Sequence, residues 1–226
     1  MSEPVAVAAR DLSMTYHNGG ADVHALRGVT LDVMPGEFLL IMGPSGSGKT
    51  TLLSILGGIL TPTKGAVMAC GVQLTSLRSR ALARFRLQNV GFIFQGFNLF
   101  GALTARENVE LALALKGAGK AASGEQALAL LDEVGLGDKP DRKPHDLSAG
   151  EKQRVAIARA LAGSPPLIMA DEPTASLDAD NGQHVTELLR SLAKSRGAAV
   201  LTVTHDPRIV DFADRIVRIE DGVLRT

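Results

Sequence analysis

The segment FLLIMGPSGSGKTTLLSIL, residues 38–56, decides the fold of this chain. Its first five residues are apolar, which is too few for a buried helix and typical of a buried strand. Residues 43–50, GPSGSGKT, then fit the pattern G-x-x-x-x-G-K-[ST], and an apolar helical pattern begins at residue 50. A strand, a glycine-rich loop and a helix in this order predict a phosphate-binding loop.

The residues of this loop suit the phosphates of a nucleotide. Glycines let backbone N–H groups wrap around phosphates, and the N-terminus of the helix adds partial positive charge. We expect Lys49 to reach the β and γ oxygens and the Thr50 hydroxyl to coordinate Mg²⁺. The predicted phosphate-binding residues are Gly43, Pro44, Ser45, Gly46, Ser47, Gly48, Lys49, Thr50 and Thr51.

Length, charge and cysteine content narrow the class of protein. At 226 residues the chain is long enough for one well-buried domain. It has 24 Lys and Arg against 24 Asp and Glu, so no overall basic field predicts nucleic-acid binding. The single cysteine, Cys70, excludes an internal disulfide and fits a reducing compartment. We expect a soluble chain, because it shows no signal-peptide pattern and no apolar run near the roughly 18 residues of a membrane span.

Short apolar runs alternate with helical patterns along most of the chain. The runs predict strands at 29–33, 38–42, 90–94, 167–170, 200–204 and 216–219. Apolar residues at helical spacing predict helices around 127–134 and 185–192. This alternation predicts an α/β fold with a mostly parallel sheet. The first 35 residues alternate polar and apolar positions around a turn at 17–22, which predicts an antiparallel layer at one edge.

Residues 101–163 interrupt this rhythm, since they hold three predicted helix starts and no convincing strand. The starts are the capping-box pairs Thr104 with Glu107, Ser123 with Gln126, and Ser148 with Glu151. We expect a single domain in which a helical subdomain at about 101–163 is inserted into an α/β core of residues 1–100 and 164–226. KGAGKAASG, residues 116–124, is the predicted flexible connection in this insertion.

LIMADEP, residues 167–173, is a predicted buried strand that ends in two carboxylates. Taken alone, such a pair is more often a solvated turn. With a phosphate-binding loop upstream, the strand end lies on the edge of a parallel sheet where ligands bind. We expect Asp171 to join the Mg²⁺ shell and Glu172 to orient or deprotonate an attacking water.

Two further polar residues follow predicted strands at the same edge. His205 comes directly after VLTVT, and Gln95 comes directly after VGFIF. By itself His205 is more often a turn or capping residue, and Gln95 is more often a plain loop residue. Beside a bound nucleotide, the imidazole can contact the γ-phosphate or hold the water.

DLSAGEKQR, residues 146–154, has two interpretations that compete. Ser148 and Glu151 form a capping box, which is an ordinary helix start. Gly150, however, lowers helix propensity, and Lys152 and Arg154 oppose the helix dipole in the first turn. A bare helix end with a glycine is also where backbone N–H groups can approach a phosphate.

In order along the chain, GPSGSGKT, Gln95, LSAGE, LIMADEP, SLD and TVTH resemble the nucleotide-binding subunits of ATP-binding cassette (ABC) transporters. The resemblance covers essentially the whole chain and implies an ATPase that uses ATP and Mg²⁺. It also implies a head-to-tail homodimer formed on ATP binding. In that dimer Ser148, Gly150 and Glu151 of one subunit meet the γ-phosphate bound by the other, and the capping box can persist.

The same resemblance implies roles at matching positions. Tyr16 resembles the aromatic residue that stacks on adenine, Glu172 the general base, and His205 the switch histidine. Asp178 lies in the segment that communicates between the two sites. Thr50, Gln95 and Asp171 complete the Mg²⁺ environment. LSAGE departs from the common signature at Ala149 and Glu151, where Gly and Gln are usual, while Ser148 and Gly150 are kept.

FQGFNLFGALTARENVELAL, residues 94–113, resembles the subgroup that serves lipoprotein-release and macrolide-type exporters. This implies integral-membrane permease partners, a cytoplasmic location on the inner face of the cell membrane, and no nucleic-acid partner. The cell-division ATPase of the same subgroup, acting on a cell-wall complex, is the alternative. A soluble cassette ATPase predicts coiled-coil insertions or a second cassette, and a kinase leaves LSAGE and SLD unexplained. Intact Glu172 and His205 oppose a non-catalytic regulatory module.

Overall fold

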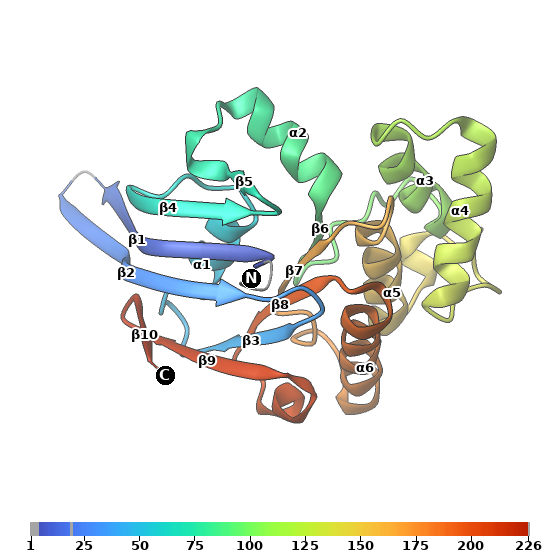
Figure 1. The fold of residues 1–226 in the computed structure, drawn as a ribbon. Coiled ribbons are helices and arrows are strands. Elements are labelled where there is room, and N and C mark those ends of the chain that lie inside the picture. The colour runs from blue at the N-terminus through green and yellow to red at the C-terminus, as the bar shows by residue number, and fades with distance from the viewer. Residues whose placement is uncertain (1–4, 19, 226) are drawn as a thin grey trace.

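A computed structural model describes residues 5–18 and 20–225, and its strands form two sheets (Figure 1). The larger sheet has six strands in the order β10-β9-β3-β8-β7-β6. Its neighbours pair in parallel, except that β10 is antiparallel to β9. The prediction of a mostly parallel sheet is therefore confirmed. The strands are β3 (Phe38–Met42), β6 (Val90–Ile93), β7 (Leu167–Asp171), β8 (Ala199–Thr204), β9 (Arg215–Glu220) and β10 (Val223–Arg225).

Alternate residues of these central strands face two different apolar cores. In β3, Leu39 and Ile41 belong to the core shared with the antiparallel sheet, while Phe38 belongs to the core under the helices. In β8, Leu201 belongs to the core shared with the antiparallel sheet and Val200 belongs to the core under the helices. Both faces are covered, which is why these strands are continuous apolar runs.

The smaller sheet is antiparallel and has four strands in the order β2-β1-β4-β5. They are β1 (Val7–Asn18), β2 (Ala21–Val33), β4 (Lys64–Ala69) and β5 (Val72–Gln73). The antiparallel layer is confirmed, but β4 and β5 also belong to it and were not predicted. The predicted strand 29–33 is the end of β2, while Gly19 of the predicted turn and residues 1–4 lie outside the described residues.

Helices cover both faces of the larger sheet (Figure 1). Helix α1 (Lys49–Leu56) contributes Leu52 and Ile55 to the core between the two sheets, and α2 (Ser79–Asn89) adds Phe85 to it. Helix α6 (Ala179–Arg196) packs on the opposite face. Short 3₁₀ turns lie at Leu74–Ser76, Pro144–Asp146 and Pro207–Phe212.

Residues 101–163 contain the helices α3 (Ala105–Leu115), α4 (Lys120–Glu133) and α5 (Ala149–Ala160), and no strand. The capping boxes at Thr104 and Ser148 are confirmed, with both reciprocal hydrogen bonds present. The three helices share one apolar core with Ile93 and Ile168 of the sheet. Whether they act as a separate subdomain stays a prediction.

The predicted helix start at Ser123 is wrong. Helix α4 begins one turn earlier, with Gly119 as its N-cap, and the Ser123 N–H donates to the Gly119 carbonyl over 2.8 Å. The buried Ser123 hydroxyl turns back to the Ala118 carbonyl instead of capping a helix. Residues 120–124 of the predicted flexible connection are therefore helical.

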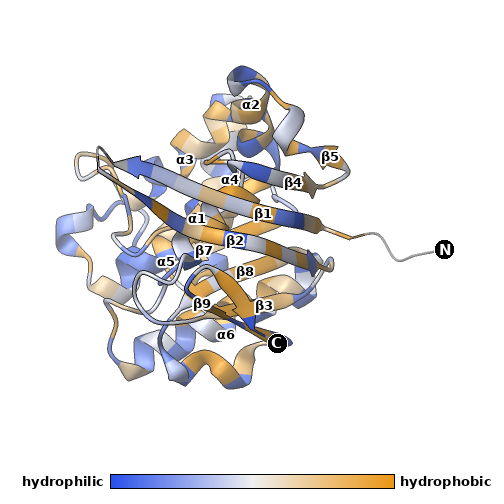
Figure 2. Cartoon of the chain, turned by 90° about the vertical axis from the view of Figure 1, so that its left-hand side faces the viewer, coloured by the Kyte–Doolittle hydropathy of each residue, from blue (hydrophilic) through white to orange (hydrophobic). Residues whose placement is uncertain are grey.

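Hydropathy follows this architecture (Figure 2). The central strand β3 is apolar along its length and β8 is mostly apolar, while the helices show hydrophobic and hydrophilic residues side by side. A helix that faces a core on one side and solvent on the other has this mixed pattern. Among the described residues, we find no helix with both the length and the apolar character needed to cross a membrane.

Candidate active site

A pocket of about 640 Å³ opens where strands β3, β7 and β8 end. The glycine-rich loop after β3, the start of α1, and the residues that follow β7 and β8 form its walls. Ligands bind at this carboxyl edge in parallel α/β sheets. The residues that line the pocket are Ala25, Pro44, Ser45, Gly46, Gly48, Lys49, Thr50, Thr51, Gln95, Asp171, Glu172 and His205.

The glycine-rich loop has a conformation that depends on glycine at two positions. Gly46 and Gly48 have φ angles of 79° and 102°, in the region that side chains rarely adopt. A Cβ atom at Gly48 would lie 2.4 Å from the carbonyl oxygen of Ala25. The loop can therefore approach β2 closely and still open its backbone toward the pocket.

Lys49 is bound to the loop that precedes it. Its ammonium group donates to the carbonyls of Gly43 and Pro44, each over 2.8 Å, and its side chain is buried. Next to it in the loop, Ser47 is 4% exposed, and its hydroxyl has no hydrogen-bond partner among the described residues. A buried hydroxyl without a partner is rare in proteins, and since Ser47 does not line the pocket, this hydroxyl lies beside the phosphate site and not in it.

Thr50 and Asp171 lie close together on one wall of the pocket. The Thr50 hydroxyl donates to Asp171 Oδ1 over 3.0 Å, and Gln95 lines the same pocket. Burial raises the pKa of Asp171, and the neighbouring carboxylate of Glu172 adds to this effect, while the bond from Thr50 opposes it. Carboxylate, hydroxyl and amide oxygens are the hard donors that Mg²⁺ prefers, so this donor set fits that ion.

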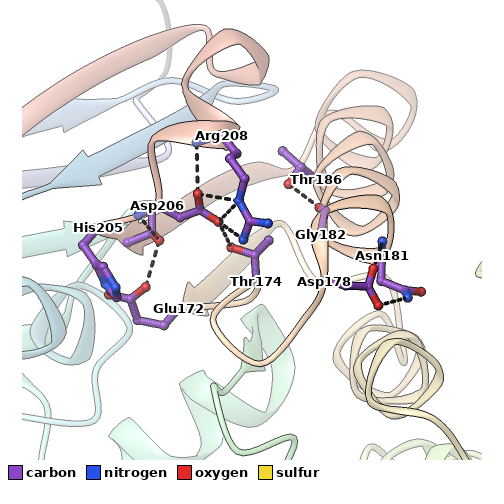
Figure 3. A network of polar contacts seen from close by, with 10 residues as sticks. Glu172, Thr174, Asp178, Asn181, Gly182, Thr186, His205, Asp206 and Arg208 are labelled. Carbon is purple, nitrogen blue, oxygen red and sulfur yellow. Dashed lines mark hydrogen bonds and ion pairs between the residues drawn. The ribbon is translucent and has the colours of Figure 1, made fainter.

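Glu172 occupies a strained position at the end of β7 (Figure 3). Its φ angle is 48°, and its N–H donates to the Val203 carbonyl on β8 over 2.9 Å. The last residue of β8 and the residue after it hold its carboxylate: the Thr204 hydroxyl donates to Oε2 over 2.8 Å, and Nδ1 of His205 lies 2.7 Å from Oε1. The structure thus brings the two predicted catalytic residues into direct contact.

A second polar network, which sequence analysis missed, lies behind this pair (Figure 3). The buried Thr174 hydroxyl donates to Asp206 Oδ2 over 3.0 Å, and Arg208 binds both oxygens of Asp206. These contacts lower the pKa of Asp206 to about 2, and the bond from Arg208 is the largest cause. Two separate connections therefore join the end of β7 to the end of β8: the contacts of Glu172 with Thr204 and His205, and the hydrogen bond from Thr174 to Asp206.

Tyr16 lies beside the pocket without lining it. It is on β1 and is 36% exposed, and its hydroxyl lies 3.5 Å from the hydroxyl of Thr51, which does line the pocket. An exposed ring at the edge of a phosphate-binding pocket can offer its face to a nucleotide base. Adenine stacking by Tyr16 stays a prediction.

Besides Tyr16 and the loop residues Gly43 and Ser47, four predicted site residues do not line the pocket of their own chain: Ser148, Gly150, Glu151 and Asp178. They lie at two helix starts that touch each other. Asp178 caps α6 by accepting from the N–H and the side-chain amide of Asn181, over 2.9 and 2.8 Å. A Cβ atom at Gly150 would lie 2.3 Å from Asn181 Oδ1, so glycine is required here for close packing.

A phosphate-binding loop, a following strand that ends in Asp-Glu, and a helical segment inserted before that strand define a P-loop ATPase of the cassette type. Comparison with known families agrees, because the model for the ABC transporter family matches residues 26–175. The chain belongs to the ABC transporter family, as an ATP-binding ATPase domain.

Individual relatives support this assignment. A solved dimeric structure of the ATP-binding cassette MJ0796, bound to ADP and Pi in a post-hydrolysis state, is 41% identical, with a TM-score of 0.90 and 97% of each chain covered. An uncharacterized ABC transporter ATP-binding protein of Mycobacterium tuberculosis (strain ATCC 25618 / H37Rv) is 46% identical over 209 residues, which cover 92% of this chain and 63% of the relative.

A third relative is longer still. The macrolide export ATP-binding/permease protein MacB of Brucella melitensis biotype 1 is 44% identical over 216 residues, covering 96% of this chain and 33% of MacB. The chain thus spans less than two thirds of the length of these two curated relatives.

Proposed function

We propose that this chain is the ATP-hydrolysing subunit of a membrane transporter. One observation carries the proposal: the Glu172 carboxylate, held by Thr204 and His205, lines the same pocket as the phosphate-binding loop and Asp171. A carboxylate fixed beside a phosphate site can accept a proton from an attacking water. A site that only bound ATP without hydrolysing it would not require such a carboxylate.

Hydrolysis of ATP follows from this arrangement. Loop N–H groups and Lys49 bind the phosphates, while Thr50, Asp171 and Gln95 would hold Mg²⁺, which neutralises phosphate charge when bound. Glu172 takes a proton from water as the water oxygen bonds to the γ-phosphorus and the bond from that phosphorus to ADP breaks. His205 orients Glu172 and contacts the γ-phosphate.

Two copies complete the site in this proposal. Ser148 and Gly150 begin a helix whose N-terminus carries partial positive charge, yet neither lines the pocket of its own chain. The dimeric form of the related cassette MJ0796 supports a second copy as the source of these residues. Asp178 lies next to them through Asn181 and connects the two sites.

The partner is an integral-membrane permease, and the role is export or lipoprotein release. This inference rests on the relative MacB, which is named as a macrolide export protein with both an ATP-binding part and a permease part. Closure of the dimer on ATP and its opening after hydrolysis would then drive the permease from the inner face of the membrane. The alternative role is control of a cell-wall or division complex by the same ATPase, and an experiment must distinguish this role from export.

Turnover of a Glu172→Gln variant tests the catalytic part. We expect ATP binding to persist and hydrolysis to fall at least about 100-fold, because the proton acceptor is lost and the phosphate contacts remain. The matched control is Gln183→Glu, an exposed change on α6 away from the pocket. Hydrolysis at the normal rate in the Glu172→Gln chain would refute the role of Glu172.

Affinity purification of the Glu172→Gln chain with ATP, from detergent-solubilised membranes of its host, tests the partner. We expect a multi-span permease in the mass spectrum, and its extracytoplasmic part would separate export from cell-wall control. Recovery of ribosomal or nucleic-acid-binding proteins instead would contradict the transporter role.

A further inference from the structure

Glu151 at the start of α5 has both carboxylate oxygens engaged. Oε2 accepts the N–H of Ser148 over 2.8 Å, as part of the capping box. Oε1 lies 2.5 Å from the ammonium group of Lys139. The carboxylate is therefore fixed beside Ser148, at the helix end that the proposed dimer turns toward a phosphate.

Lys139 is itself held in place by its segment. It lies in the connection between α4 and the 3₁₀ turn at Pro144–Asp146. The carbonyls of Pro140 and Arg142 in this connection accept the N–H groups of Arg106 and Ala105 at the start of α3, over 2.9 and 2.8 Å. The ammonium group thus comes from an anchored loop, which lowers the entropic cost of the ion pair.

A carboxylate at this position creates an electrostatic problem for a phosphate-binding helix end. The bonds from Lys139 and Ser148 lower the pKa of Glu151 to about 2, so the side chain is ionised at neutral pH. An uncompensated carboxylate next to Ser148 would repel a triphosphate. Protonation cannot remove that charge at neutral pH, so a cation must compensate it.

We propose that Lys139 is a positioning and charge-compensating residue of the composite ATP site. It neutralises the Glu151 carboxylate, which in the dimer lies next to the γ-phosphate bound by the second copy. The inference rests on the proposed head-to-tail dimer. Lys139 thereby allows this chain to use Glu at position 151. A glutamine there would keep an oxygen for the Ser148 N–H and would need no cation.

The competing explanation is structural, because the ion pair also connects the loop after α4 to α5. The two explanations differ in one respect. If Lys139 acts by compensating charge, removal of the Glu151 charge makes Lys139 dispensable for dimerisation. If the pair only stabilises the fold, the loss of both partners leaves the dimer as weak as the loss of Lys139 alone.

The test measures ATP-dependent dimerisation by multi-angle light scattering over a range of chain concentrations, with the Glu172→Gln chain as parent. The variants in this background are Lys139→Met, Glu151→Gln, and the two combined. Lys143→Met is the matched control, since Lys143 is an exposed lysine of the same connection. ATP binding to the monomer and the thermal unfolding temperature are measured for each variant.

We expect Lys139→Met to weaken the ATP-dependent dimer at least about ten-fold, through repulsion between Glu151 and the phosphates. Added salt should reduce this defect by screening. Glu151→Gln should restore dimerisation in the combined variant, and monomer ATP affinity should stay unchanged throughout. Dimerisation of Lys139→Met at the parent's affinity, or failure of Glu151→Gln to rescue it, would overturn the inference. A parent that stays monomeric with ATP would overturn the composite site itself.

Discussion

The Thr204 hydroxyl donates to Glu172 Oε2 over 2.8 Å and joins the end of β8 to the carboxylate after β7. The hydroxyl oxygen of Thr204 also accepts the N–H of Asp206 over 3.0 Å. Since Thr204 is fully buried, its χ1 angle is fixed by packing and its hydroxyl has one orientation that satisfies both partners. Thr204 therefore fixes the direction of the Glu172 carboxylate.

Replacing Thr204 by Val should lower kcat about ten-fold with little change in KM for ATP, because the carboxylate loses its orientation while the phosphate contacts remain. Steady-state ATPase kinetics measure both constants. Thr204→Ser keeps the hydroxyl and should recover most of the rate.

Thr202→Val is the matched control for this change. Thr202 lies on the same strand and is buried, but its hydroxyl has no hydrogen-bond partner among the described residues. Its replacement should leave kcat unchanged and stabilise the fold by about 1 kcal/mol. Equal losses of kcat in Thr202→Val and Thr204→Val would show that the strand, and not the hydroxyl of Thr204, controls the rate.

Gly150→Ala should destabilise the chain by about 1–3 kcal/mol, because the new methyl group would lie 2.3 Å from Asn181 Oδ1, and Asn181 is bound to Asp178. Urea unfolding measures the effect. Gly124→Ala is the control, since this glycine is also helical but its nearest contact would be 3.5 Å away. Gly124→Ala should be neutral or stabilising by up to about 1 kcal/mol. Equal stability of Gly150→Ala and the parent would contradict the close packing.

The Asp206 pKa predicts a dependence of stability on pH. Arg208 holds this pKa near 2, below the ordinary value of 3.8, so folding favours the ionised form. Its contribution is complete above about pH 4 and is lost as the pH falls toward 2. Asp206→Asn should flatten the free energy of unfolding against pH between about 4 and 2, as measured by urea titrations. An unchanged slope would show that Asp206 is not ionised preferentially in the folded chain.

Tyr16→Ala should weaken ATP binding to the monomer about ten-fold if the ring stacks on adenine, whereas Tyr16→Phe should bind like the parent. Isothermal titration calorimetry measures both. The hydroxyls of Tyr16 and Thr51 lie 3.5 Å apart, so a loss in Tyr16→Phe would instead implicate the contact between these two hydroxyls. Unchanged binding by Tyr16→Ala would remove this residue from the nucleotide site.

Features fixed by local spacing could be predicted from the sequence. The phosphate-binding loop depends on glycines at set positions, and the capping boxes at Thr104 and Ser148 depend on residues three apart. The central strands were also predictable, because a strand buried on both faces is a continuous apolar run. Asp171 and Glu172 could be predicted in turn, because they stand at the end of one such strand.

Features that depend on residues distant in the chain could not be predicted in this way. The contact of Gly150 with Asn181, the bond from Thr204 to Glu172 and the ion pair of Lys139 with Glu151 each join two elements. Ser123 shows the limit of local patterns: its spacing fits a capping box, yet an earlier helix start at Gly119 prevails. Strand β4 was missed because the exposed residues Lys64, Gly65 and Met68 leave it without a continuous apolar run, and β5 was missed because it has only two residues.

Mixing two inactive variants tests the composite site most directly. Glu172→Gln disables the pocket, and Ser148→Arg disables the helix end, so each chain alone should hydrolyse little ATP. Thr104→Arg is the control, because it removes the same type of helix cap away from the pocket. A mixed head-to-tail dimer has one intact pocket facing one intact helix end, so we predict that ATP hydrolysis returns on mixing. A mixture as inactive as its components would contradict a site shared between two chains.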